Sequence, residues 1–127
     1  MEYIFLLARV VFGGYFIMAA FNHLRNSDML AGYAGSKNVP SPKAAVIASG
    51  IIALLGGLGI VLGVYVNLAV FLVLIFLIPI TFMVHNFWKA PTPEARQMDR
   101  IQFQKNIALM AGALAFLAVA QPWMWSL

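Results

Sequence analysis

The amino-acid sequence predicts an all-α integral membrane protein, in which four membrane-spanning helices form a bundle and a short interfacial helix lies between the first two. The 127-residue chain is 63% hydrophobic and only 9% charged, and its mean hydropathy is +0.90. Soluble domains are roughly 25% charged, so a bilayer must solvate this much apolar surface. At about 20 residues per span, residues 1–127 have room for four helices in a single domain.

The first span is expected over residues 3–24, and it is followed by a polar connection. Asn26 or Ser27 in this connection can cap the start of a short interfacial helix. The connection ends at Ser41 and Pro42, which are typical residues for a helix N-cap and the first helical position. They predict the start of the second span.

The second span is predicted over residues 43–62, and it is rich in small residues. Ser49, Ala53 and Gly57 follow one another at four-residue spacing, so they lie on one face of a helix. Small residues in this arrangement allow two helices to approach closely. The ridge therefore indicates tight packing, either within the bundle or against a partner protein.

The third span is expected over residues 65–88, and Pro79 is expected to kink it about two turns before His85. Thr92, Pro93 and Glu94 then form a typical helix start, with a capping hydroxyl, proline and an early acidic residue. This helix is amphipathic at first, with Arg96, Asp99 and Arg100. It then enters the membrane as the fourth span, over residues 101–120, and Trp123 and Trp125 follow at an interface.

The distribution of basic residues predicts the orientation. Four spans place both termini on one side and both polar connections on the other. Arg9 is the only basic residue near the side of the termini; the others accompany the connections, at Arg25, Lys37, Lys43, Lys89, Arg96, Arg100 and Lys105. The positive-inside rule therefore places the connections in the cytoplasm and both termini outside.

Polar residues at three helix ends are expected to share one membrane depth and to form a pocket. One predicted helix face carries Thr81, His85 and Trp88, and another carries Gln102, Lys105 and Asn106. Polar stripes on membrane helices face the bundle interior, so these side chains are expected to point inward. Phe87, Trp88 and Phe103 supply aromatic walls, and the pocket opens to the cytoplasmic side. The candidate pocket residues are Asn22, His23, His85, Trp88, Lys105 and Asn106.

Arg9 lies on nearly the same face of the first span as His23, but about 21 Å away along the helix. No acidic residue lies within a predicted span to pair with it. The sequence leaves three arrangements open: Arg9 joins a structural polar network of main-chain carbonyls and amides near Asn67 and Gln121, reaches the outer head groups, or holds an anionic ligand.

Several motifs resemble the DoxX family of small bacterial inner-membrane proteins. The most specific are His85-Asn86-Phe87-Trp88 and Phe103-Gln104-Lys105-Asn106, which are accompanied by Arg9, by Asn22-His23, and by Gly56-Gly57 and Leu62-Gly63. The chain departs from the family pattern where Ala53 replaces a frequent Glu and Asn67 a frequent Arg. One possible charge pair is therefore missing, which weakens any role that needs a carboxylate within the membrane.

The resemblance implies a four-helix membrane bundle in a bacterial inner membrane, associated with redox or oxidative-stress systems. Relatives include the small subunit of a thiosulfate:quinone oxidoreductase and a membrane partner of superoxide dismutase and a sulfurtransferase. More distant relatives act as assembly chaperones or cargo receptors. The resemblance alone does not decide whether the chain is an enzyme.

Two functions stand foremost. One is a subunit in quinone-linked electron transfer, with His85, Trp88, Lys105 and Asn106 forming a quinone site. The other is a non-catalytic assembly or scaffold protein. Haem b between His23 and His85 is a less favoured third, because the two rings would have to face each other across the iron.

The composition limits cofactors and partners further. The chain has no Cys, which removes thiol–disulfide chemistry, iron–sulfur ligation and Cys-based zinc sites, and no metal site is expected. The dispersed basic residues do not indicate nucleic-acid binding. The expected partners are the lipid bilayer, a membrane or peripheral protein, and further copies of the chain.

Overall fold

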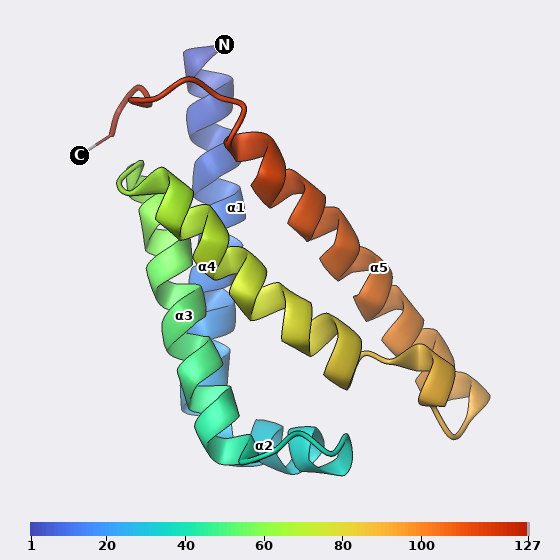
Figure 1. Cartoon of the computed structure of the whole chain (residues 1–127). Coiled ribbons are helices and arrows are strands. Elements are labelled where there is room, and N and C mark those ends of the chain that lie inside the picture. Colours follow the sequence, from blue (N-terminus) through green and yellow to red (C-terminus); the bar gives the residue numbers. More distant parts are fainter. Residues whose placement is uncertain (127) are drawn as a thin grey trace.

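The computed structural model describes residues 1–126, in which every regular element is helical. Five α-helices and two short turns of other helix types follow one another along the chain (Figure 1). They are α1 (Glu2–Arg25), α2 (Ser27–Ser36), α3 (Pro42–Leu62), α4 (Val66–Pro79), the π-helical turn η1 (Ile80–Val84), the 3-10 turn η2 (Phe87–Lys89) and α5 (Pro93–Phe116).

Three helical segments are long and apolar enough to cross a membrane: Glu2–Arg25, Pro42–Leu62 and Val66–Lys89. The fourth helix of spanning length, α5, carries Asp99 and Arg100 in its first half and Lys105 at its middle. It begins at Pro93, as Thr92 and Pro93 predict, but it ends at Phe116, before the end of the predicted span over residues 101–120. The all-helical membrane class is confirmed, whereas a bundle of four spans stays a prediction.

Close packing of α1 on α3 forms the centre of the fold, and the residues that meet there are glycines. A Cβ atom placed on Gly13 would lie 2.6 Å from the Gly57 carbonyl oxygen, and one on Gly57 would lie 2.7 Å from the Gly13 carbonyl oxygen. Both contacts are shorter than carbon and oxygen atoms tolerate. Gly57 of the small-residue ridge is therefore used inside the protein, against α1.

We expect Gly13→Ala to destabilise the protein, because the new methyl group would force α1 and α3 apart. Overpacking of this kind typically costs about 1–3 kcal/mol. Gly14→Ala is the matched control, since a Cβ atom there meets no atom within 4 Å. Thermal unfolding in detergent should show a clear loss only for Gly13→Ala. Equal midpoints for the two variants would contradict the close α1–α3 contact.

The chain between α4 and α5 departs from the predicted straight span over residues 65–88. Helix α4 ends at Pro79, and a π-helical turn carries the chain to Val84. His85 then leaves helical geometry, with φ −99° and ψ 43°. Thr81 is buried, while Trp88 is 49% exposed, so the predicted stripe of Thr81, His85 and Trp88 does not exist. Proline removes one main-chain hydrogen bond within α4 and favours a kink, but the regular helix continues through Pro79 itself.

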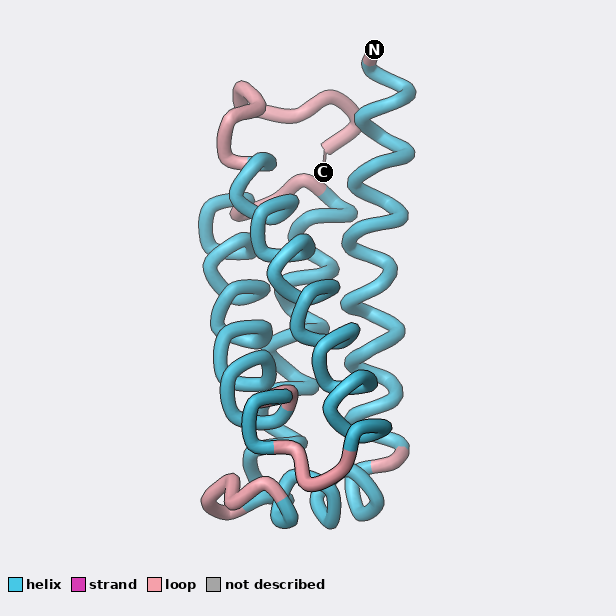
Figure 2. The backbone as a smooth tube through the Cα atoms, turned by 90° about the vertical axis from the view of Figure 1, so that its right-hand side faces the viewer, coloured by secondary structure: helices cyan, strands magenta, loops and turns pink. Residues whose placement is uncertain are grey.

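The start of α1 and the segment that follows α5 lie at one end of the molecule, and α2 lies across the other end (Figures 1 and 2). The end that carries α2 also holds the start of α3, the two short turns and the start of α5 (Figure 1). This agrees with the sequence analysis, which places both polar connections on the same side of the bundle. Which end faces the cytoplasm stays a prediction.

Arg9 fastens the C-terminal segment across the opposite end of the molecule. Its side chain is 1% exposed. The guanidinium donates to the main-chain carbonyls of Val61 at 3.2 Å, Trp125 at 2.7 Å, and Met124. Trp123 also lies beside the guanidinium.

The structure therefore places Arg9 in a buried network of carbonyls rather than at a head group. Asn67 and Gln121 are not part of this network, because they bond to each other at 3.0 Å. The network closes the C-terminal segment onto α1 and the end of α3, which lie far from it in sequence.

Candidate functional site: the Asp99 cluster

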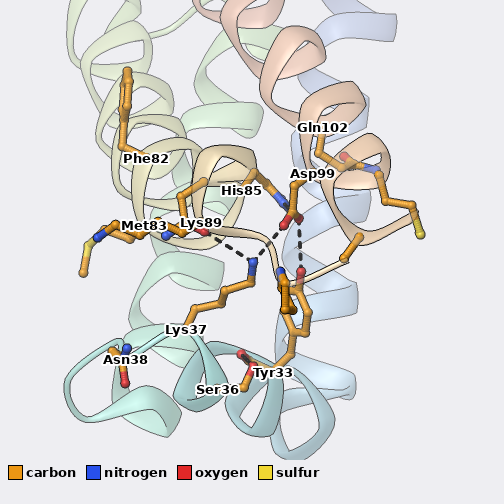
Figure 3. Close-up of a pocket in the computed structure, with 14 residues that line it drawn as sticks. Tyr33, Ser36, Lys37, Asn38, Phe82, Met83, His85, Lys89, Asp99 and Gln102 are labelled. Atoms are coloured by element: carbon orange, nitrogen blue, oxygen red, sulfur yellow. Dashed lines mark hydrogen bonds and ion pairs between the residues drawn. The ribbon is translucent and has the colours of Figure 1, made fainter. Parts of the chain in front are cut away.

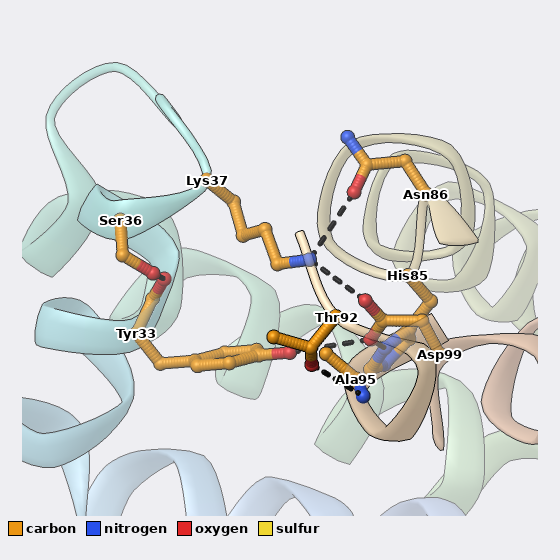
Figure 4. A network of polar contacts seen from close by, with 8 residues as sticks. All are labelled: Tyr33, Ser36, Lys37, His85, Asn86, Thr92, Ala95 and Asp99. Atoms are coloured by element: carbon orange, nitrogen blue, oxygen red, sulfur yellow. Dashed lines mark hydrogen bonds and ion pairs between the residues drawn. The ribbon is translucent and has the colours of Figure 1, made fainter. Parts of the chain in front are cut away.

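A buried carboxylate at the start of α5 organises the richest group of polar contacts. Asp99 is 4% exposed and meets Tyr33, Lys37 and His85, and these four residues are called the Asp99 cluster below. The start of α5 is fixed by Thr92, whose hydroxyl accepts a hydrogen bond from the Ala95 N–H at 3.1 Å. The capped helix thus presents Asp99 toward α2 and the His85 segment (Figure 4).

The two carboxylate oxygens of Asp99 have different partners. Lys37 Nζ lies 2.8 Å from Oδ2. The Tyr33 hydroxyl donates to Oδ1 at 3.3 Å, and His85 Nδ1 lies 3.4 Å from the same oxygen. Lys37 also donates to the side-chain oxygen of Asn86 at 3.3 Å. The cluster therefore joins α2, the segment after η1, and α5 (Figure 4).

The local folding of each element explains why these side chains meet. Tyr33 lies in the last turn of α2 and Lys37 directly follows the helix, and the Lys37 ammonium lies 5.8 Å from the centre of the Tyr33 ring. The π-helical turn and the irregular backbone at His85 bring the imidazole to Asp99 of α5. Turns of this type are frequent at functional sites.

The electrostatics of the cluster favour an ionised Asp99 and a protonated Tyr33 at neutral pH. Burial alone would raise the pKa of the Asp99 carboxyl, but hydrogen bonds from Lys37 and His85 outweigh it and lower that pKa. Burial raises the pKa of the Tyr33 phenol, and the neighbouring Asp99 carboxylate raises it further. The cluster therefore presents an ammonium, a phenol and an imidazole around one carboxylate.

The cluster borders a cavity of about 880 Å³, called the first cavity (Figure 3). A second cavity of about 570 Å³ lies beside it among α1, α2, α3 and α4. The first cavity has Tyr33, Lys37, His85, Asp99 and Gln102 among its lining residues, and most of the second is apolar. Four residues border both cavities: Tyr33, Met83, His85 and Gln102. The two chambers therefore adjoin at the cluster, and the first carries more polar groups than the second.

The structure separates the residues that the sequence analysis assigned to one pocket. His85 borders both cavities, and Asn22 and His23 border the second. Asn106 is buried but borders neither cavity. The exposed Lys105 donates to Gln102 at 2.6 Å and lies over the Tyr15 ring. Trp88 packs edge-on against Phe103, at a ring distance of 5.8 Å, outside both cavities.

Sequence reasoning missed Asp99, Tyr33 and Lys37 as parts of the site. Asp99 was assigned to the exposed face of an amphipathic helix start, although it shares a helix face with Gln102 and Asn106 at spacings of three and seven residues. That longer stripe was a usable signal. The contribution of α2 was harder to predict, because a ten-residue helix across the end of the molecule can face in many directions.

The two histidines considered as haem ligands both border the second cavity. His23 Nδ1 lies 3.0 Å from the Ser49 hydroxyl and 3.3 Å from the Val46 carbonyl oxygen. Its ring also packs against Phe76, at a centroid distance of 5.3 Å. Within residues 1–126, no three His, Cys, Asp or Glu side chains gather in a way that could hold a metal ion. A haem between these histidines stays the less favoured hypothesis.

The apolar helices define a helical membrane protein, and a comparison with known families makes the class more specific. The model of the DoxX family matches residues 4–86, which is well over half of the chain. The chain therefore belongs to the DoxX family, and the resemblance drawn from its motifs is confirmed. The match includes Tyr33, Lys37 and His85, but Asp99 and the Phe103–Asn106 motif lie beyond it. No curated protein and no solved structure matches the chain.

Proposed function

We propose that the protein is a membrane component of a quinone-linked redox system and that it binds the quinone head group at the Asp99 cluster. The observation that carries this proposal is the position of the cluster, whose charged and polar groups lie where two largely apolar cavities meet. A quinone has matching parts, since its carbonyl oxygens need hydrogen-bond donors and its ring needs an apolar slot. Small-molecule sites commonly combine an apolar chamber with a few placed polar groups.

Each residue of the cluster has a chemical role in this proposal. The Lys37 ammonium gives two of its three protons to Asp99 and Asn86, so the third can donate a hydrogen bond to a quinone oxygen. Asp99 holds Lys37, Tyr33 and His85 in place. Reducing a quinone to a quinol takes two electrons and two protons. The electrons come from a partner oxidoreductase, and His85 exchanges protons with a quinone oxygen, a task for which imidazole is suited near neutral pH.

The family and the distribution of basic residues support a membrane location and an orientation for the protein. We place the protein in a bacterial inner membrane, as a multi-pass protein with α5 as a fourth span and both termini outside. The first cavity then faces the cytoplasmic side, where basic residues gather and protons are available. A membrane or peripheral oxidoreductase is the expected partner.

A scaffold function without quinone chemistry is the second candidate, and the outer face of α5 favours it. Ala108, Ala111 and Ala115 are exposed there, on a helix that packs mainly on α4 and the two short turns. Small residues on an exposed face can admit a partner helix closely. This candidate predicts that quinones do not bind.

Thermal unfolding with added quinone tests the proposal. A ligand at a hundred times its dissociation constant stabilises the native state by about 2.7 kcal/mol. Decylubiquinone should therefore raise the unfolding midpoint of the detergent-purified protein by several degrees. Decylbenzene, which has the same tail without carbonyl oxygens, is the control and should not. Equal midpoints with both compounds would reject the quinone site and favour the scaffold function.

A further inference from the structure

The second cavity lies beside the proposed head-group site, and its lining is mostly apolar. Its walls come from α1, α2, α3, α4 and η1, and most of the lining side chains are aliphatic. The polar group at its α1 side is already satisfied, because His23 Nδ1 lies within 3.0 Å of the Ser49 hydroxyl. Every buried side-chain nitrogen and oxygen atom in residues 1–126 has a hydrogen-bond partner. The cavity therefore suits an apolar occupant.

The rim of the second cavity is accessible from the apolar outside of the protein. Ala48 of α3 and Ile75 and Pro79 of α4 border the cavity and are also exposed. These residues lie in two of the segments that are apolar enough to cross a membrane. An apolar chain in the cavity thus has a way out between α3 and α4 into the bilayer.

We propose that the second cavity holds the first isoprenoid units of a quinone side chain, which leaves the protein between α3 and α4. This inference rests on the proposed function, because it takes the quinone ring to lie in the first cavity. Tyr33, Met83, His85 and Gln102 border both chambers, which is where the ring and its side chain would join. The substrate class is therefore a lipid-soluble, long-chain quinone rather than a water-soluble one.

Chain-length dependence of binding tests this inference, with Ile52→Trp as the main variant. Ile52 borders the second cavity, so an indole there should occupy part of the space of the side chain. The neighbouring Ile51 faces outward, with 47% exposure, and Ile51→Trp is the matched control. Affinities are measured for a ubiquinone without side chain and for decylubiquinone, by titration in one detergent. Comparing each variant with the wild type for the same compound cancels partitioning into micelles.

We expect Ile52→Trp to weaken decylubiquinone binding by about tenfold or more, which corresponds to the loss of one or two buried methylene contacts. Binding of the short quinone should stay within about twofold, and Ile51→Trp should change neither. Ala48→Phe fills the rim from an exposed position and should repeat the pattern if Ile52→Trp fails to fold.

The outcomes separate this inference from the proposed function. If both cavity variants bind the two quinones as the wild type does, the side chain lies elsewhere and the head-group site is unaffected. Equal losses for both compounds would also overturn the side-chain site, since the substitutions would then act on the ring. If the wild type binds neither compound, the proposed function itself fails.

Discussion

Replacing Arg9 by lysine should lower the free energy of unfolding by about 3 kcal/mol, through the loss of two charged hydrogen bonds of about 1.5–3 kcal/mol each. Lysine retains the positive charge but lacks the planar fork of donors. One ammonium group cannot take up the positions from which the guanidinium reaches the carbonyls of Val61, Met124 and Trp125. The C-terminal segment should therefore separate from α1. Unfolding in mixed micelles of increasing denaturing detergent measures the loss.

Arg25→Lys is the control for this prediction, because Arg25 is exposed and makes no side-chain hydrogen bond or ion pair in the described part of the chain. It should unfold like the wild type. Limited proteolysis adds a second readout, since a released C-terminal segment should be cut sooner in Arg9→Lys. If Arg9→Lys is as stable and as protease-resistant as the wild type, the carbonyl network does not hold the C-terminal segment, and Arg9 acts only as a membrane-surface anchor.

Replacing Asp99 by asparagine should cost about 2 kcal/mol, between the values for exposed ion pairs and for fully buried ones. The substitution keeps the shape of the side chain but removes the charge that holds Lys37, whose side chain is only 16% exposed. Asp28→Asn is the matched control, because Asp28 pairs with Lys43 at the surface and is 89% exposed. It should change the unfolding midpoint little. Equal effects of the two substitutions would contradict a special role for Asp99.

The pH dependence of this difference has a definite sign. The native pKa of Asp99 lies below its ordinary value of 3.8, so the unfolded chain takes up its proton at higher pH than the native protein. The carboxylate therefore contributes its full stability above the unfolded pKa and loses it as the pH falls through the native pKa. The wild type and Asp99→Asn should differ constantly from pH 5 to 7, and this difference should shrink below about pH 4.

The helical membrane class was predictable, because it depends on composition and on long uncharged stretches. The starts of α3 and α5 were also predictable from Ser41-Pro42 and Thr92-Pro93, which are local signals. The end of α4 was not predicted correctly. Pro79 indicated a kink, but a π-helical turn and a break at His85 depend on what the following segment packs against.

The site was predicted only in part, for a related reason. Spacing along a helix singled out His85 near the end of the third span, and the structure places it beside both cavities. It assumed a regular helix through Trp88, and so it assigned Trp88 and Lys105 to the same pocket. The spacing of Asp99 with Gln102 and Asn106 was a signal for its burial, but the sequence does not reveal that α2 lies across the end of the molecule and supplies its partners. Tertiary packing, rather than local periodicity, decides which polar residues meet.

Quinone affinity of His85→Gln and Lys105→Gln tests the central claim most directly. His85 borders both cavities and belongs to the Asp99 cluster, whereas Lys105 is exposed and borders neither cavity. Both substitutions introduce glutamine, and both positions were predicted from the sequence to line one pocket. The account predicts that decylubiquinone binds Lys105→Gln as it binds the wild type. It predicts that His85→Gln binds it about tenfold or more weakly, because the ring that meets Asp99 and borders both cavities is lost. Unchanged binding by His85→Gln, or an equal loss in both variants, would contradict it.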